Sequence, residues 1–448
     1  MRLSEFKYYA KELLNIALPI IMGNLGFIMI GAGDVLIAGR HSTDTLAAIS
    51  IATAISNCIL TFGIGLIASV SPLLSNYRGE KQSAKKYFFP TIRFSMILAF
   101  IMMIAVLAFV PVIDYMKFEP KLVAPIKEYM IITAFSTFGG YLHAALKEFL
   151  QAFEVVFFPN LVTVFSVFLN IALNTILVFG WGPIPSLGVI GLAIASFTVR
   201  YFMGFALLWY CFTLMKFRNY NNDIDYFKSL IKIGLPISLA ILIEFVAFNC
   251  VAIIMGRVSG VYAAAQNLVC TLTTVSFMIP LALSNAIAVK VGFANGAQNI
   301  MELRRYAYIG IGMAVSFMIF SSIIFSSFPH FLVGLFTSDA ALVKISVPVL
   351  YVLALFQIFD GLQVSLSGIF KGIKKTKIVM IANFIGYWLI SIPLGYTLAF
   401  KYNMNIMGFW YGLVSAAVIL CAIMLIILRK YLAEMKKNLN FVKLEEEY

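Results

Sequence analysis

Charge is scarce in this sequence. Only 12% of its 448 residues are Asp, Glu, Lys or Arg, whereas 62% are hydrophobic. A soluble domain is about 25% charged and about 45–50% apolar, so no soluble catalytic domain is expected here. The net charge of +13 does not by itself indicate nucleic acid, because lysine and arginine collect in the cytoplasmic loops of membrane proteins. The composition predicts a polytopic integral membrane protein.

Metal-binding and nucleotide-binding motifs are also missing. The cysteines lie far apart in apolar segments and form no ligand cluster; they are Cys58, Cys211, Cys250, Cys270 and Cys421. Gly296-Ala297-Gln298 lacks the Lys-Ser/Thr pair that a phosphate-binding loop needs. We therefore expect no cofactor, no ATP-driven transport by this chain, no nucleic-acid partner and no enzyme activity.

What the sequence does have is a series of long apolar runs, each able to cross a bilayer as a helix of roughly 20–25 residues. The runs are long and do not alternate, which favours helices over strands. The predicted spans are 13–38, 46–71, 87–113, 124–147, 156–180, 187–214, 230–256, 262–290, 306–333, 345–370, 378–400 and 406–428. The expected fold class is an all-α membrane protein of twelve transmembrane helices.

The distribution of basic residues predicts the orientation. With the N-terminus inside, 24 of the 33 lysines and arginines fall in inner segments and 7 in outer ones. Basic residues accumulate on the cytoplasmic side, so both termini are predicted to be cytoplasmic.

The chain also repeats itself at an offset of 217 residues. This offset pairs Leu18-Pro19-Ile20 with Leu235-Pro236-Ile237, Gly39-Arg40 with Gly256-Arg257, Ala47-Ala48 with Ala264-Ala265, and Gly79 with Gly296. A unit of six helices returns to its starting side, so the two halves are predicted to be parallel repeats, a plan that places transport sites between them near the midplane. The predicted domains are an N-terminal lobe (1–215), a cytoplasmic connection (216–231), a C-terminal lobe (232–430) and a cytoplasmic tail (431–448).

Three carboxylates stand alone within apolar runs: Asp34 in 13–39, Glu244 in 233–256 and Asp360 in 345–370. A charged side chain at a helix centre costs roughly 2.5–3.5 kcal/mol on insertion scales, so it marks a functional site by default. Glu244 and Asp360 are both deep in the second half, where two carboxylates raise each other's proton affinity or ligate a small cation. The alternative is a protonated acid in a structural hydrogen bond.

Polar side chains in the first half could complete a site with Asp34. Asn170 and Asn174 share one face of the fifth span at i, i+4, and Thr198 lies in the sixth. Ordinary hydrogen bonding between helices is the alternative for the asparagines. Arg200 is either a counter-ion of Asp34 or extends to the interface. Gly31 and Gly33 admit close helix approach beside Asp34.

Aromatic pairs supply a second kind of candidate. Tyr387-Trp388 and Trp410-Tyr411 could line a cavity for flat organic cations through cation–π contacts. The alternative is that these rings are interfacial bulk.

Several of these stretches together resemble the multidrug and toxic compound extrusion (MATE) family, most closely its NorM-type branch. The stretches are Asp34-Val35-Leu36-Ile37-Ala38-Gly39 with Leu46-Ala47-Ala48, Gly234-Leu235-Pro236 with Glu244, Ala264-Ala265-Gln266, Phe356-Gln357 with Asp360, Gln363 and Gly368, and Tyr387-Trp388 with Pro393, Gly395 and Tyr396. The resemblance covers nearly the whole chain and implies two six-helix bundles around a V-shaped cavity.

The resemblance also implies roles for single residues. Glu244 and Asp360 match coupling acids of the C-terminal lobe, and Asp34, Asn170, Asn174 and Thr198 match a cation or substrate site of the N-terminal lobe. The candidate cavity-lining residues are Gln266, Phe356, Gln357, Gln363, Tyr387 and Trp388. Phe356 departs from the family, because some NorM-type members have a tyrosine there, and its missing hydroxyl weakens the assignment of a cation site at Asp360.

The implied activity is export of cationic, amphipathic drugs or toxic organic compounds in exchange for Na⁺ or H⁺, by alternating access, in a monomer of the inner membrane. Na⁺ is a candidate ligand of either carboxylate site. The alternative is a flippase for a lipid-linked oligosaccharide or another lipid. Such a carrier would be expected to have basic residues in its cavity for pyrophosphate, whereas the deep charges here are three acids and one arginine.

Overall fold

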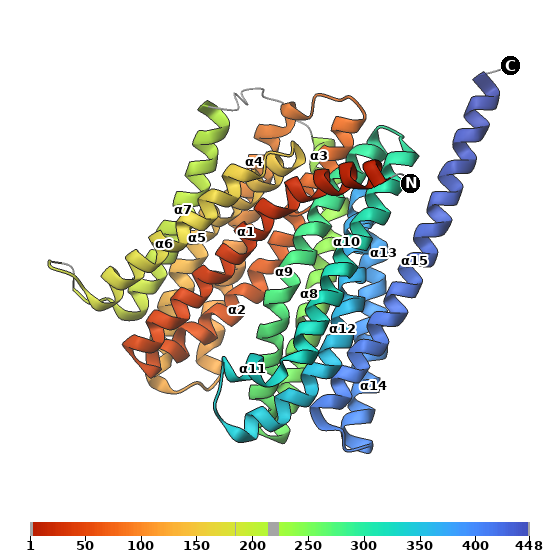
Figure 1. The fold of residues 1–448 in the computed structure, drawn as a ribbon. Coiled ribbons are helices and arrows are strands. Elements are labelled where there is room, and N and C mark those ends of the chain that lie inside the picture. Colours follow the sequence, from red (N-terminus) through yellow and green to blue (C-terminus); the bar gives the residue numbers. More distant parts are fainter. Residues whose placement is uncertain (1–2, 184, 214–223, 447–448) are drawn as a thin grey trace. The chain divides into compact units, whose positions relative to one another are not determined.

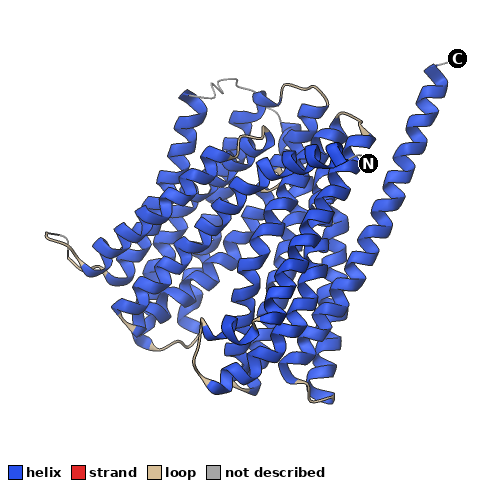
Figure 2. Ribbon diagram, viewed as in Figure 1, coloured by secondary structure: helices blue, strands red, loops and turns tan. Residues whose placement is uncertain are grey.

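The computed structural model describes residues 3–183, 185–213 and 224–446 (Figure 1). These residues form helices joined by short loops and no β-strand (Figure 2). The α-helices are α1 (Leu3–His41), α2 (Thr43–Ile67), α3 (Val70–Gly79), α4 (Phe88–Phe109), α5 (Pro120–Ala152), α6 (Phe157–Phe179), α7 (Gly188–Thr213), α8 (Ile224–Val258), α9 (Gly260–Gly296), α10 (Ile300–Ser327), α11 (Pro329–Gly334), α12 (Ala340–Gly372), α13 (Thr376–Asn383), α14 (Ile392–Tyr396) and α15 (Asn405–Glu446). Short 3-10 helices cover Ala84–Tyr87 and Val110–Tyr115, and π-helical turns cover Phe384–Ser391 and Thr397–Lys401. The predicted all-α class is confirmed.

Within the described residues, eleven helical stretches are long and apolar enough to cross a membrane. The predicted span 124–147 corresponds to α5, which is 33 residues long but is not one of the eleven. The middle of α5 carries small and polar residues, among them Ser136, Thr137 and His143, which are buried inside the protein. Contacts between membrane helices are enriched in such small and hydrogen-bonding residues, which lowers the hydropathy of the helix. Of the predicted connection 216–231, residues 216–223 lie outside the described residues, and 224–231 form the start of α8.

The contacts between residues divide the chain into two compact units. The C-terminal unit comprises Met1–Ala17, Ser75–Gln82 and Leu239–Tyr448, and the N-terminal unit comprises Leu18–Leu74 and Ser83–Ser238. The predicted lobes 1–215 and 232–430 follow the order of the sequence and stay a prediction. The spatial units differ from them because the first part of α1 packs with the second half and the first part of α8 packs with the first half.

Equivalent tyrosines hold these two exchanged segments. In the C-terminal unit, the ring of Tyr9 meets Tyr306 edge-on with 4.8 Å between centroids. In the N-terminal unit, Tyr226 stacks on Tyr87 at 4.5 Å. Tyr9 and Tyr226 are 217 residues apart, the offset of the repeat. Aromatic pairs of this kind contribute about 0.5–1.5 kcal/mol beyond the area they bury. The exchange is therefore built into both repeats.

Helix boundaries follow the same offset. Ser42 caps α2 by accepting from the backbone of Thr45, and Ser259 caps α9 by accepting from Val261. After α3 and after α9 the chain turns through a left-handed residue, Lys81 (φ 58°) and its repeat mate Gln298 (φ 57°). Such a residue at the end of a helix lets the following amides bond back to the last carbonyls. The two halves thus share their caps and turns as well as their helices.

Candidate intramembrane carboxylate sites

In the N-terminal unit, Asp34 of α1 accepts hydrogen bonds from two neighbouring helices. Asn174 Nδ2 lies 2.6 Å and Asn170 Nδ2 lies 3.1 Å from Asp34 Oδ1, and Ser196 Oγ lies 3.2 Å from Oδ2. Asn170 and Asn174 are fully buried on one face of α6. A carboxylate taken out of water needs such donors, since an unpaired buried charge is costly. The arrangement stabilises a negative charge within the bundle.

Oxygen atoms beside Asp34 give the same cluster a capacity to bind cations. The amide oxygen of Asn174 is buried and has no hydrogen-bond partner among the described residues. Carboxylate and amide oxygens are ligands of hard cations such as Na⁺. Neither neighbouring glycine is required for this packing: a Cβ at Gly33 would make ordinary van der Waals contact, 3.5 Å from Asn170 Oδ1, and a Cβ at Gly31 would meet nothing within 4 Å.

The structure brings together Asp34, Asn170 and Asn174 but not Thr198. The hydroxyl of Thr198 is exposed and donates to the carbonyl of Ile194 at 2.8 Å. Ser196 takes the place expected for it. Two residues along a helix are about 200° apart around the axis, so Ser196 and Thr198 cannot both face Asp34. Arg200 donates to Ser136 Oγ at 2.8 Å, which identifies its direct hydrogen-bond partner on α5.

The angular position of Ser196 around the axis of α7 could have identified it from the sequence. Arg200 and Ser196 are i, i+4 on α7, so they share a face, whereas Thr198 does not share it. The buried Tyr129 of α5 lies near both Ser196 and Asp34, so α5, α6 and α7 all contribute to the surroundings of Asp34.

In the C-terminal unit, Glu244 of α8 and Asp360 of α12 form the second site. Asp360 is only 4% exposed and lies within the electrostatic field of Glu244. Glu244 lies near Tyr387, whose hydroxyl is 3.3 Å from Gln363 Nε2. Two nearby carboxylates repel each other when both are ionised, so a cation or a proton between them relieves the repulsion.

A π-helical turn presents the residues beside this carboxylate pair. Tyr387 and Trp388 both lie in Phe384–Ser391. Trp388 donates its indole N–H to the Ile243 carbonyl at 3.1 Å, next to Glu244 in sequence. Gln363 donates to Asn383 Oδ1 at 3.2 Å. Turns of this type occur mostly as single insertions and are frequent at functional sites.

Aromatic rings cluster near the same pair. Phe248 lies 6.0 Å from Tyr387 and 6.4 Å from both Phe356 and Trp410, measured between ring centroids. Trp410 donates to Gln266 Oε1 at 3.0 Å. Phe356 and Trp410, like Gln266, are almost completely buried, so in this state they pack on one another. Sequence reasoning did not identify Phe248, although it lies four residues after Glu244 on the same face of α8.

Gln357 differs from the other candidate cavity residues. It is fully buried on α12, and neither its amide oxygen nor its amide nitrogen has a hydrogen-bond partner among the described residues. A buried amide without partners costs free energy and calls for an explanation, such as a ligand, an ion or a second conformation.

Both sites are built from oxygen and aromatic groups rather than from a transition-metal cluster. Within the described chain, no group of three or more His, Cys, Asp or Glu side chains could hold a metal ion. Two carboxylate sites inside a polytopic helical protein are typical of a secondary transporter.

Comparison with known proteins identifies the family. The sequence model of the MatE family matches residues 19–176 and again 236–397. The chain therefore belongs to the MatE family, and the resemblance predicted from the sequence is confirmed. The two matches begin 217 residues apart, which is the offset of the internal repeat.

Relatives span nearly the whole chain. A probable multidrug resistance protein NorM of Mesorhizobium japonicum is 29% identical over 428 residues, covering 92% of each chain. The multidrug resistance protein NorM of Burkholderia vietnamiensis is 28% identical over 419 residues, covering 91% of each. The solved structure of the eukaryotic MATE transporter AtDTX14 matches 97% of this chain and 99% of that one with a TM-score of 0.85 at 20% identity. A MATE structure in the bent conformation matches 98% and 99% with a TM-score of 0.88 at 18% identity.

Proposed function

We propose that this membrane protein is a secondary-active antiporter that exports cationic, amphipathic organic compounds in exchange for Na⁺ or H⁺. The observation that carries the proposal is the pair Glu244 and Asp360, two carboxylates of a membrane bundle that interact electrostatically with each other and with Tyr387. The NorM relatives named as multidrug resistance proteins support the class of cargo.

The carboxylate pair supplies the coupling. When both acids are ionised, their repulsion favours an incoming cation, whether this is Na⁺, a proton or the charged cargo. A bound coupling ion neutralises the carboxylate pair. It therefore weakens the binding of a cationic cargo to the same two carboxylates. That competition converts an inward ion gradient into export, with each ligand shifting the population of conformations by its differential affinity.

The Asp34 cluster supplies a second cation site in our proposal. Its donors hold the carboxylate in place, and the unpartnered Asn174 oxygen adds a ligand. Na⁺ would bind to the Asp34 and Asn174 oxygens directly, whereas a proton would neutralise Asp34 alone. Thr198 is outside this proposal, and Ser196 is included in it.

The aromatic rings near the carboxylate pair support flat organic cations as the class of cargo. Phe248, Tyr387 and Trp410 offer ring faces near two carboxylates. A flat cation gains from both kinds of group, because cation–π attraction adds to charge pairing. A flippase for a lipid-linked pyrophosphate would instead need a cluster of cations at this position, whereas the described groups that act on Glu244 and Asp360 are the two carboxylates themselves, the Tyr387 phenol and the cation Lys371.

We further propose that both termini are cytoplasmic and that the protein resides in the inner membrane. The charge bias of the loops supports this orientation. Cysteine labelling of intact cells tests it, in a background with the five native cysteines replaced. A cysteine at Pro183 should react with an impermeant reagent, and one at Lys375 should not. The reverse pattern would overturn the orientation.

The experiment that tests the function uses proteoliposomes with a fluorescent organic cation. An inward Na⁺ gradient and an inward proton gradient are imposed one at a time, and dye movement is compared with liposomes containing Glu244→Gln protein. Gradient-driven movement by the wild type under at least one gradient, lost in the variant, supports antiport. Equal movement in both preparations, or none under either gradient for several dyes, contradicts it.

A further inference from the structure

The C-terminal ends of α3 and α9 cross in close contact. At the crossing, a glycine of each helix lies against the backbone of the other helix. A Cβ on Gly79 would overlap the carbonyl oxygen of Phe293, and a Cβ on Gly296 would overlap the carbonyl oxygen of Asn76. Gly79 and Gly296 are repeat mates at the offset of 217, and so are Asn76 and Phe293. We call these four residues the glycine crossing; they all belong to the C-terminal unit.

Reciprocity of this kind has a geometric meaning. When residue i of one copy contacts residue j of the other, and j contacts i in return, the two copies meet at a two-fold axis. The glycine crossing therefore lies where the axis that relates the repeats passes through the C-terminal unit. At that axis, each repeat contributes equivalent residues to the contact.

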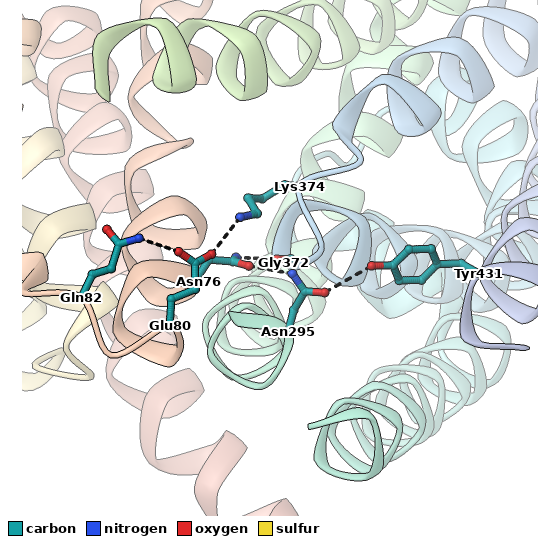
Figure 3. A network of polar contacts seen from close by, with 7 residues as sticks. All are labelled: Asn76, Glu80, Gln82, Asn295, Gly372, Lys374 and Tyr431. Atoms are coloured by element: carbon teal, nitrogen blue, oxygen red, sulfur yellow. Dashed lines mark hydrogen bonds and ion pairs between the residues drawn. The ribbon is translucent and has the colours of Figure 1, made fainter. Parts of the chain in front are cut away.

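Polar contacts join Asn76 of the crossing to neighbouring helices (Figure 3), and the Arg78 guanidinium lies 5.4 Å from the centre of the Phe293 ring. Asn76 Nδ2 donates to the Gly372 carbonyl at 2.7 Å, and Asn295 Nδ2 donates to Asn76 Oδ1 at 2.7 Å. Tyr431 OH donates to Asn295 Oδ1 at 3.2 Å. These bonds stabilise the contact between the two helix ends.

An ion pair lies at the edge of the same network. Lys374 Nζ is 3.3 Å from Glu80 Oε1, and Gln82 Nε2 is 2.8 Å from Glu80 Oε2 (Figure 3). Both charged side chains of the pair are about one-third exposed, so the pair contributes little to stability. Such a pair can form and break at low cost.

The crossing lies on the side of the basic loops. Gly372, which accepts from Asn76, ends α12 just before the loop that holds Lys374, and Asp360 is twelve residues earlier on the same helix. At a rise of 1.5 Å per residue, this places the crossing about 18 Å from Asp360 along α12. That distance is more than half the hydrocarbon thickness of about 30 Å, so the crossing lies near one face of the membrane.

We propose that the glycine crossing is the seal that closes the transport path on the basic-loop side, and that it separates when the path opens to that side. The inference rests on the proposed function, because a seal requires a path. Glycine is needed at both positions for the backbones to touch, because a side chain at either one would overlap the facing carbonyl.

The first test measures the crossing without transport. Lys81→Cys and Gln298→Cys are introduced together into a background lacking the native cysteines and carry spin labels. Both positions are exposed and directly follow the crossing helices. A pulsed electron paramagnetic resonance experiment should give a population at short distance in the parent protein. Gly296→Ala should shift the distribution to longer distances, and Gly79→Ala should do the same.

Gly312→Ala is the matched control, because a Cβ at Gly312 meets nothing within 4 Å. It should leave the distribution unchanged. An unchanged distribution in both crossing variants would overturn the inference. If these variants fail to reach the membrane, the second test decides, because it keeps both glycines.

The second test joins the two labelled positions. A short bifunctional thiol reagent with a cleavable disulfide links the two cysteines introduced by Lys81→Cys and Gln298→Cys, and efflux is followed before and after reduction. Linkage should reduce export roughly tenfold or more, and reduction should restore it. The same reagent on Asp114→Cys and Lys127→Cys, whose native side chains form an ion pair within the N-terminal unit, should have no such effect.

Linked protein that exports at the unlinked rate would overturn the seal. This outcome is distinct from failure of the proposed function, in which the unlinked protein exports nothing under either gradient. In that case the spin-label distances still decide whether the crossing opens when the alanine is introduced.

Discussion

Residues 3–82 and 224–299 follow one pattern at an offset of 217, yet they differ in the residues that carry charge inside the membrane. Tyr9 and Tyr226, Ser42 and Ser259, and Lys81 and Gln298 occupy equivalent places. The acids do not. The mate of Asp34 is the buried Val251, and the mate of Glu244 is Phe27, which is 60% exposed.

This difference separates two kinds of constraint. Caps, turns and tyrosine contacts satisfy backbone geometry and packing, which both halves need equally. A carboxylate inside a membrane is costly, so each of these acids is a candidate for a functional role rather than for packing. The two sites also differ in their surroundings: Asp34 accepts hydrogen bonds from several donors, whereas Glu244 interacts electrostatically with Asp360 and Tyr387.

The largest expected effect comes from removing the charge of the two acids in the second half. Glu244→Gln and Asp360→Asn should each reduce gradient-driven efflux roughly tenfold or more, because the amide keeps the size but loses the charge that a cation must neutralise. Phe27→Glu combined with Glu244→Gln should not restore transport, since the equivalent position in the first half is exposed. Efflux from proteoliposomes containing equal amounts of protein checks this, and Asp114→Asn serves as a surface control. Wild-type rates for both single variants would remove the coupling site from the second half.

The next largest effect concerns the Asp34 site in the first half. Asp34→Asn should cost far more activity than Asn174→Ala, because only Asp34 carries charge, and the double variant should be no worse than Asp34→Asn alone. Ser196→Ala should reduce efflux a few-fold through its lost bond to Asp34, on the order of 1 kcal/mol.

Thr198→Ala is the matched control for Ser196→Ala. Its hydroxyl bonds only within its own helix, so efflux should stay near the wild-type rate. Measurements on one cationic and one neutral substrate then separate a coupling role from a substrate role. Small, equal and additive losses in all of these variants would leave Asp34 as a packing residue.

The sequence predicts the features that depend on composition, spacing and repetition. Spans, the offset of 217 and the isolated acids all follow from the order of residues along the chain, and Asn170 and Asn174 follow from i, i+4 spacing. The orientation stays a prediction. Rotation of a helix about its axis is harder, because a membrane helix is apolar on most sides and its periodicity is weak. That is why Thr198 was expected where Ser196 lies. Contacts between distant segments, such as Tyr9 with Tyr306 or Gly79 with Phe293, need the folded chain.

A smaller effect compares the two exchanged segments. Tyr226 OH lies 2.8 Å from Thr91 Oγ1 in a buried contact, whereas Tyr9 OH accepts from Arg305 at 3.1 Å in a partly exposed one. Tyr226→Phe should destabilise the protein by about 1 kcal/mol, the net value of a typical hydrogen bond. Tyr9→Phe should cost less, because Arg305 keeps its ion pair with Glu5 at 3.1 Å.

Thermal unfolding in detergent measures both tyrosine variants, with the exposed Tyr115→Phe as control. The melting temperature should fall most for Tyr226→Phe, by roughly 2 °C. A larger fall for Tyr9→Phe would mean that the first segment of α1 is held more tightly than the first segment of α8.

The smallest effect concerns the two serine caps. Ser42 Oγ accepts from the Thr45 amide at 3.0 Å and also donates to Thr45 Oγ1 at 2.9 Å, whereas Ser259 Oγ accepts from the Val261 amide at 3.3 Å. A serine cap is worth about 0.5–2 kcal/mol over alanine. Ser42→Ala should therefore lower the melting temperature slightly more than Ser259→Ala, and asparagine at either position should restore most of the loss because its side chain also caps. Ser50→Ala, which removes only an exposed hydroxyl bonded to Leu46 within the helix, should change nothing measurable. Equal losses at Ser42, Ser259 and Ser50 would show that the shared caps of the two repeats add nothing beyond the hydroxyl itself.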